Sequence, residues 1–246
     1  MKASLTCGLA ICLILQAAHG FAGLRSAPQE QRLEDKLFQA VSAVGGRSSS
    51  SKQQQQEIES AISALEAAGG ILRPACSPTV NGRWRLLYTL QGGDRASASP
   101  IQKGFVGVKG FGIYQNIDLT GQVPSVTNVV DFGEKVGALE VQAVASTVDR
   151  PLAGFTPRAG DGKIFGIPLF GVSETKPPKD PAARIDFKFD QAGFDLIPLP
   201  ISIPYPVPFR LLGDDVKGWI DITYLSPRLR LSRGDTGTTF VLQKEE

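Results

Sequence analysis

Histidine and cysteine are scarce in this sequence, which has one histidine and three cysteines among 246 residues. The histidine, His19, and two of the cysteines, Cys7 and Cys12, lie within the first 20 residues. Without that segment, the chain has no imidazole for a Ser-His-Asp or Cys-His catalytic device or for a metal site. The remaining cysteine, Cys76, has no partner for an internal disulfide or a structural zinc site.

The first 20 residues have the pattern of a secretory signal that is cleaved. Lys2 precedes an apolar run over residues 9–18, and Ala18-His19-Gly20 supplies small residues for signal peptidase, so we expect cleavage after Gly20. The run is about half of the ~20 residues that a membrane-spanning helix needs, which disfavours the alternative of a permanent anchor. Secreted proteins of this size usually carry disulfides, so their absence indicates a further destination.

Residues 21–28, Phe-Ala-Gly-Leu-Arg-Ser-Ala-Pro, follow the expected cleavage site and contain no acidic residue. They resemble the transit portion of the bipartite leader of algae with secondary plastids, in which an aromatic residue, usually Phe, follows the signal. The alternative is a mature N-terminus that begins with Phe21 by chance.

Charge of either sign is not in excess. Removal of Lys2 from the 26 basic residues leaves 25, which face 24 acidic residues. This balance disfavours a nucleic-acid partner and strong attraction to anionic lipid. With 42% apolar and 20% charged residues, the chain is typical of a globular protein with one substantial core.

Residues 29–70 predict a pair of amphipathic helices, the first ended by Gly45-Gly46 and the second by Gly69-Gly70. We expect the pair to pack on the main domain, and a face for a membrane or a partner is the alternative. The apolar residues of the two stripes are Leu33, Leu37, Phe38, Val41 and Val44, then Ile58, Ile62 and Leu65.

Residues 76–246 predict an all-β domain, because short runs of β-branched and aromatic residues alternate with Gly and Pro turns. Eight or nine short strands suit a barrel or a sandwich. The proline-rich stretches 157–181 and 198–208 are expected to be loops over a barrel end or edge. The expected strands are 84–90, 104–108, 113–119, 125–132, 138–147, 184–189, 218–225, 229–233 and 238–243.

Gly82-Arg83-Trp84 opens the first expected strand, in which Trp84, Leu86 and Tyr88 alternate onto one face. We interpret that face as the interior. A Gly-x-Trp start is similar to that of lipocalin-type barrels, in which an arginine of the closing strand covers the Trp ring through a cation–π contact. Arg230 or Arg233 is the expected cation. Gly82 and Trp84 are therefore expected to close the barrel, with ligand contact by Trp84 as the alternative.

The last third of the chain carries a more specific signature, formed by residues 203–215, 218–225, 229–235 and 240–242. These segments resemble the closing part of the plastid lipid-associated protein (PAP)/fibrillin family, and the resemblance covers residues 29–246. It implies a mainly β fold, a lipocalin-like antiparallel β-barrel with an N-terminal pair of α-helices. It also implies a plastid protein at plastoglobules or thylakoids that binds prenylquinones, carotenoids or acyl lipids.

The resemblance carries over no catalytic residue, cofactor or metal. Pro227 and Arg228 depart from the family, which often has an acidic residue or Ser there, so the geometry of this turn is open. Asp221 stands among apolar neighbours and is expected to pair with Arg230 or Arg233 as part of barrel closure, because an unpaired buried carboxylate is costly. The alternative is an acid with a perturbed pKa. An enzyme using Asp221, Tyr224 and Arg233 is a remote alternative.

The leading expectation for function is a non-catalytic barrel that holds or presents an apolar lipid or isoprenoid. The alternative is a filled barrel that docks on a lipid globule or on a partner enzyme of isoprenoid metabolism, through the helices and the 198–208 loop with Tyr205 and Phe209 at its apolar edge. The pattern does not decide whether the barrel is hollow. Strand alternation selects these lining positions: Trp84, Leu86, Tyr88, Ile113, Ile117, Trp219, Leu229 and Leu231.

Overall fold

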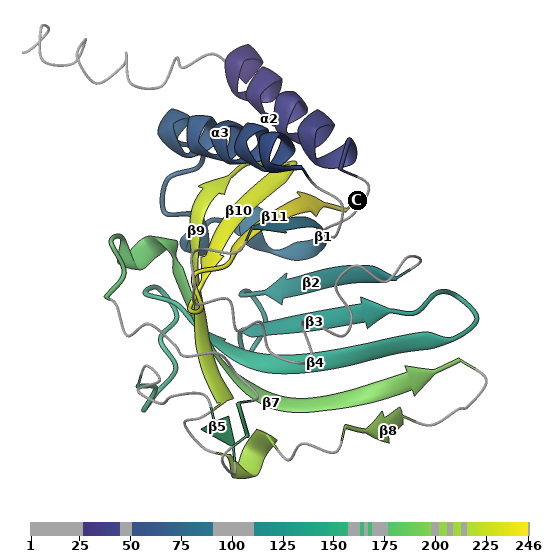
Figure 1. Cartoon of the computed structure of the whole chain (residues 1–246). Coiled ribbons are helices and arrows are strands. Elements are labelled where there is room, and N and C mark those ends of the chain that lie inside the picture. Colours follow the sequence, from purple (N-terminus) through teal and green to yellow (C-terminus); the bar gives the residue numbers. More distant parts are fainter. Residues whose placement is uncertain are drawn as a thin grey trace, which may run out of the picture.

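A computed structural model describes residues 27–44, 51–90, 111–156, 163–164, 167–168, 177–197, 202–205, 209–212 and 216–245 of the chain (Figure 1). The expected signal segment, residues 1–20, and the expected strand 104–108 lie outside the described residues. The expected transit portion, 21–28, lies outside them up to residue 26, and its last two residues already belong to the first helix.

The two predicted helices are present as α2 (Ala27–Ser42) and α3 (Lys52–Ala68). A capping box starts α3: the Gln54 amide donates to Ser51 Oγ, and the Ser51 amide donates to Gln54 Oε1. Gly69 ends the helix with a φ of 105°, a conformation that residues with a Cβ rarely adopt, and its amide donates to the Leu65 carbonyl.

Nine strands form one antiparallel sheet in the order β4-β3-β2-β1-β11-β10-β9-β7-β8, and a β4–β7 pairing joins eight of them into a closed ring (Figure 1). The short β5 (Lys163–Ile164) and β6 (Ile167–Pro168) pair separately. The strands of the large sheet are β1 (Gly82–Leu90), β2 (Gly112–Asp118), β3 (Ser125–Asp131), β4 (Gly137–Ser146), β7 (Arg184–Leu196), β8 (Ser202–Pro204), β9 (Lys217–Leu225), β10 (Leu229–Gly234) and β11 (Thr239–Lys244).

Strand β7 is longer than expected, because it continues past residue 189 to Leu196. One edge of β7 pairs with β4 almost along its whole length. The other edge pairs first with β9 and then, over Gly193–Asp195, with β8. Strand β8 lies in a stretch that was expected to be a loop. Its Pro204, which has no amide hydrogen, is accommodated because β8 is the edge strand of the sheet.

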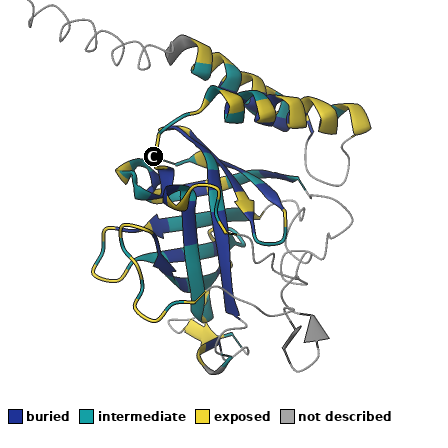
Figure 2. Cartoon of the chain, turned by 90° about the vertical axis from the view of Figure 1, so that its left-hand side faces the viewer, coloured by how far each residue is buried: buried dark blue, intermediate teal, exposed yellow. Residues whose placement is uncertain are grey.

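Apolar side chains fill two layers, one inside the ring and one between the ring and the helices. The interior core takes buried residues from seven of the eight ring strands, and η2 (Pro74–Cys76) and η3 (Pro78–Val80) contribute to it. The helix layer joins α2 and α3 to the outer faces of β1, β9, β10 and β11. Figure 2 shows the helices buried on the side toward the strands and exposed on the other side. The predicted packing of the helical pair on the domain is confirmed.

Polar contacts also fix the helices on the ring. The hydroxyl of Tyr224 on β9 donates to Glu34 Oε1 of α2 at 2.9 Å, and the Glu34 side chain is buried. Arg228 in the β9–β10 turn donates to Asp35 at 2.8 Å, so this turn contacts α2 directly. Arg233 of β10 donates to both carboxylate oxygens of Glu66 on α3.

The Tyr224 contact is expected to contribute most to the attachment of α2. Tyr224→Phe removes the donor and leaves a buried carboxylate without its closest partner, so we expect a loss of about 1–3 kcal/mol in the free energy of unfolding, measured by urea titration. Glu66→Gln, which weakens a more exposed pair, serves as the control and should cost clearly less. Equal losses in the two variants would contradict the importance given to Tyr224.

Candidate functional site

The interior of the ring is fully packed in the half next to η2 and η3. Trp84 of β1, Ile117 of β2 and Val126 of β3 are almost completely buried there. The indole Nε1 of Trp84 donates to the carbonyl of Val80 at 2.7 Å, which joins the strand to η3. This half therefore has the packing of an ordinary protein core.

The other half of the interior is less enclosed. Strand alternation places Ile113 and Gln115 on the same face of β2 as Ile117, and the regular β2–β3 and β3–β4 registers extend that face across the neighbouring strands. Leu139, the register partner of Val130, is 1% exposed on this face, whereas five other side chains on it are only partly buried. They are Ile113, Gln115, Asn128, Val130 and Val141.

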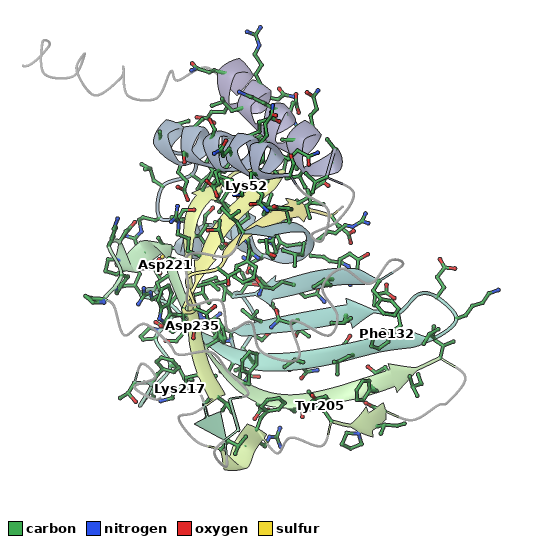
Figure 3. All side chains as sticks on the ribbon, in the orientation of Figure 1. Lys52, Phe132, Tyr205, Lys217, Asp221 and Asp235 are labelled. Atoms are coloured by element: carbon green, nitrogen blue, oxygen red, sulfur yellow. The ribbon has the colours of Figure 1, made fainter. Side chains whose placement is uncertain are left out.

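A row of aromatic rings borders this half along β7 and continues into the proline-rich segment. We call Phe187, Phe189, Phe194, Tyr205 and Phe209 the aromatic row. Successive ring centroids lie 5.3 Å apart for Phe187 and Phe189, 5.9 Å for Phe189 and Phe209, 6.3 Å for Phe209 and Tyr205, and 5.7 Å for Tyr205 and Phe194. Figure 3 shows Tyr205 beside β7.

The aromatic row corrects one part of the docking hypothesis. That hypothesis placed Phe209 on an exposed apolar edge, but Phe209, in η6 (Phe209–Leu211), is 3% exposed and packs with Phe189 and Val141. Tyr205 is partly buried in the same cluster. The reason is that the segment folds back against the strands and buries its rings there.

Arg230 is a buried charged group of the interior. It is 1% exposed, and its guanidinium carbon lies 5.1 Å from the centroid of the Trp84 ring. Its Nη2 donates to Gln115 Oε1 at 2.5 Å, whereas its Nε and Nη1 have no hydrogen-bond partner among the described residues. Burial lowers the pKa of Arg230 to about 9, because a low dielectric disfavours the charged form.

Lys244 adds a second cation to the same ring. Its Nζ lies 4.5 Å from the Trp84 centroid and donates to the carbonyl oxygens of Thr79 and Asn81. Burial, and then the charge of Arg230, lower the pKa of Lys244. Gly82 opens β1 with a φ of 111°, and a Cβ there would press on the end of the Lys244 side chain. Glycine is therefore favoured at the position predicted to belong to barrel closure.

Asp221 pairs with an arginine that sequence reasoning missed. Arg184 Nε donates to Asp221 Oδ1 at 2.6 Å, and Arg184 Nη2 donates to Oδ2 at 2.7 Å. The Arg184 guanidinium also stacks 3.8 Å from the Trp219 ring. The expected partners, Arg230 and Arg233, are wrong, because β10 turns Arg230 into the ring and Arg233 toward Glu66. Arg184 is the register partner of Asp221 on β7, 37 residues earlier in the chain.

The predicted lining positions fall into three places. Trp84, Leu86 and Ile117 belong to the interior core or pack against it, and Ile113 shares the face of Ile117. Tyr88, Leu229 and Leu231 lie in the helix layer instead. Trp219 lies under Arg184, with Asp221 on the same face of β9; Figure 3 labels Asp221.

Two physical causes explain these corrections. The β1–β11 register shifts between Leu86 and Tyr88, and such a bulge turns the following residues to the other face. On β10, the helices cover Leu229 and Leu231 from outside, so Arg230 and Ser232 face inward. The interior positions that were not selected include residues of the packed core, such as Ile185, Ile220, Ile222 and Leu242, and, in the other half, Gln115, Asn128, Val130, Val141 and the rings of the aromatic row.

The described residues offer no catalytic grouping around the three candidate residues of the remote enzyme hypothesis. Asp221 pairs with Arg184, Tyr224 with Glu34, and Arg233 with Glu66. In the described part of the chain, no group of three or more His, Cys, Asp or Glu side chains could hold a metal ion. Neither described helix is long and apolar enough to cross a bilayer.

The fold and its interior define a mainly β protein with two helices, whose strand ring is solid in one half and partly accessible in the other. The sequence matches the model of the PAP_fibrillin family over residues 31–243. The chain belongs to the PAP/fibrillin family. The predicted family resemblance is therefore confirmed.

Three relatives show the extent of the similarity. The probable plastid-lipid-associated protein 12, chloroplastic, of Arabidopsis thaliana is 44% identical over 216 residues, which are 86% of this chain and 44% of the relative. The chromoplast-specific carotenoid-associated protein C1 of an Oncidium hybrid cultivar is 29% identical over 77% of this chain and 61% of its own length. The chromoplast-specific carotenoid-associated protein of Cucumis sativus is 28% identical over 79% and 62%, respectively.

This chain therefore spans less than two thirds of each of these relatives. The names of all three are those of chloroplastic or chromoplastic proteins, which supports a plastid location, and none is the name of an enzyme. No solved structure matches the chain significantly.

The pairing of Asp221 with Arg184 predicts coupled effects on stability. Asp221→Asn and Arg184→Met should each lower the free energy of unfolding by about 2–3 kcal/mol, because each removes the forked, charge-assisted pair between these two side chains. The double variant should cost little more than either single one. Asp190 and Arg210 have the same forked geometry but are more exposed, so Asp190→Asn is the matched control and should cost much less. Additive losses in the double variant would show that the pair is not coupled.

Proposed function

We propose that this protein holds or presents apolar small molecules inside its ring of strands and performs no catalysis. The ring acts as a lipocalin-like barrel in this proposal. The observation that carries it is the contrast within the interior: one half is fully packed, whereas inward residues such as Ile113, Val130 and Val141 remain partly exposed. A long apolar molecule placed there gains about 25 cal/mol for each Å² that leaves water.

The aromatic row suits such a ligand. Its rings offer a large apolar surface along β7, and the few polar groups nearby, Gln115 and Asn128, can orient a bound molecule. The names of the relatives favour plastid lipids and carotenoids. Prenylquinones, carotenoids and acyl lipids are therefore the ligand classes that we propose, with peripheral association at plastoglobules or thylakoids.

The route to the plastid belongs to the same proposal. Residues 1–20 act as a signal and the following residues to position 28 as the transit portion, as in plastids of secondary origin. Because α2 begins at Ala27, the last two residues of the proposed transit portion belong to the helix.

Mass spectrometry of co-purifying lipid tests the function directly. Residues 27–246 are incubated with a total plastid lipid extract and repurified, and we expect a prenylquinone, carotenoid or acyl lipid in near-stoichiometric amount. Val130→Trp, which places a large ring on the partly exposed inward face, should lower the bound amount several-fold. The matched control is Val123→Trp in the exposed β2–β3 turn, which should leave it unchanged.

Two outcomes would contradict the proposal. A chain that takes up no lipid would favour the filled barrel that docks on a lipid globule or a partner enzyme. Lipid retained equally by the two tryptophan variants, with unchanged circular dichroism and melting temperature, would place the lipid outside the ring.

A further inference from the structure

A bound anion would stabilise the buried guanidinium of Arg230. In the described part of the chain, no carboxylate pairs with it, and its one hydrogen-bond acceptor is the neutral amide oxygen of Gln115. The cation nearest to it, Lys244, adds positive charge on the same Trp84 ring. Two other arginines of the ring do have carboxylate partners: Arg184 and Arg233 each donate two hydrogen bonds to one carboxylate. A buried guanidinium with two nitrogen atoms that lack an acceptor is costly unless a ligand supplies one.

A polar chain connects Arg230 to the accessible half of the interior. Arg230 Nη2 donates to Gln115 Oε1, and Gln115 Nε2 donates to Asn128 Oδ1 at 2.9 Å. Gln115 and Asn128 are register partners on β2 and β3 and are partly exposed. Ser232, whose buried Oγ has no hydrogen-bond partner in the described ranges, follows Arg230 on the inward face of β10. Hydrogen bonds therefore connect the partly exposed amides of Asn128 and Gln115 to the buried guanidinium of Arg230.

We propose that Arg230 is the head-group anchor of the ligand site and binds the carboxylate of a long-chain fatty acid, which replaces Gln115 as its partner. The carboxylate accepts from two guanidinium N–H groups, a stronger interaction than the single bond to a neutral amide. The Gln115 side chain moves toward Asn128, and the acyl chain extends past Val130 and Val141 toward the aromatic row. This inference rests on the proposed function and adds the chemical class and the orientation of the ligand.

The first test measures orientation with Arg230 intact. Trp219→Phe leaves Trp84 as the single tryptophan, and Trp84 lies 5.1 Å from the Arg230 guanidinium. Stearate carrying a doxyl quencher at carbon 5 should then quench Trp84 fluorescence strongly, and stearate labelled at carbon 16 should quench it weakly. Equal quenching by the two probes, or stronger quenching by the carbon-16 label, would overturn the inference.

The second test measures the contribution of the charge. Arg230→Met replaces the charged side chain with an unbranched apolar one. It should weaken stearate binding by about tenfold or more, whereas the affinity for stearyl alcohol should not change. Arg233→Met is the matched control, because it removes an arginine from the outer face of the same strand, and it should change neither affinity. Unfolding curves of the variants confirm that each is folded before its affinity is compared.

The outcomes separate this inference from the proposed function. If stearate and stearyl alcohol bind equally and Arg230→Met changes neither, the ring holds lipid but Arg230 only covers Trp84, and the anchor is overturned. If neither probe binds and no lipid co-purifies, the proposed function itself fails.

Discussion

The packing of α2 and α3 on the outer faces of β1, β9, β10 and β11 is the contact on which the rest of the structure depends. A strand whose outer face is open to water must place its apolar residues inside. On β10 the helices remove that requirement, so Leu229 and Leu231 point outward into the helix layer. The inward face is left with Arg230 and Ser232. The polar groups inside the ring are thus a consequence of the helices outside it.

The distribution of charge follows the same division. On the outside, acids and arginines are matched, as in the forks of Asp221 with Arg184 and of Glu66 with Arg233. Asp186 on the same face has its pKa raised, first by burial and then by nearby Asp221, against the opposing effect of Arg184. Inside, Arg230 contacts the Gln115 amide and the Trp84 ring, and the charged group that acts on the same ring is another cation, Lys244. The described interior therefore carries positive charge at Arg230 and Lys244, which suits a ligand with an acidic end.

Much of the fold follows from local patterns in the sequence, whereas the site follows from long-range pairing. The helical stripes, the cap at Ser51 and most strand positions could be predicted, because each depends on residues a few positions apart. The second half of β7 could not, because Gln191-Ala192-Gly193 has no strand pattern and is held by β4 and β8. The face of Tyr88 depends on a bulge, and the partner of Asp221 depends on the β7–β9 register. Neither leaves a local signal.

The central claim is that an apolar ligand occupies the accessible half of the ring interior, and intermolecular NOEs to methyl-labelled protein test it most directly. With bound stearate, we expect NOEs from the acyl chain to the methyl groups of Val130 and Val141. The methyl groups of Leu229 and Leu231 should show none, because these side chains lie on the outer face of β10, between the ring and the helices. NOEs confined to the helix layer, or absent from Val130 and Val141 at saturation with ligand, would contradict the account.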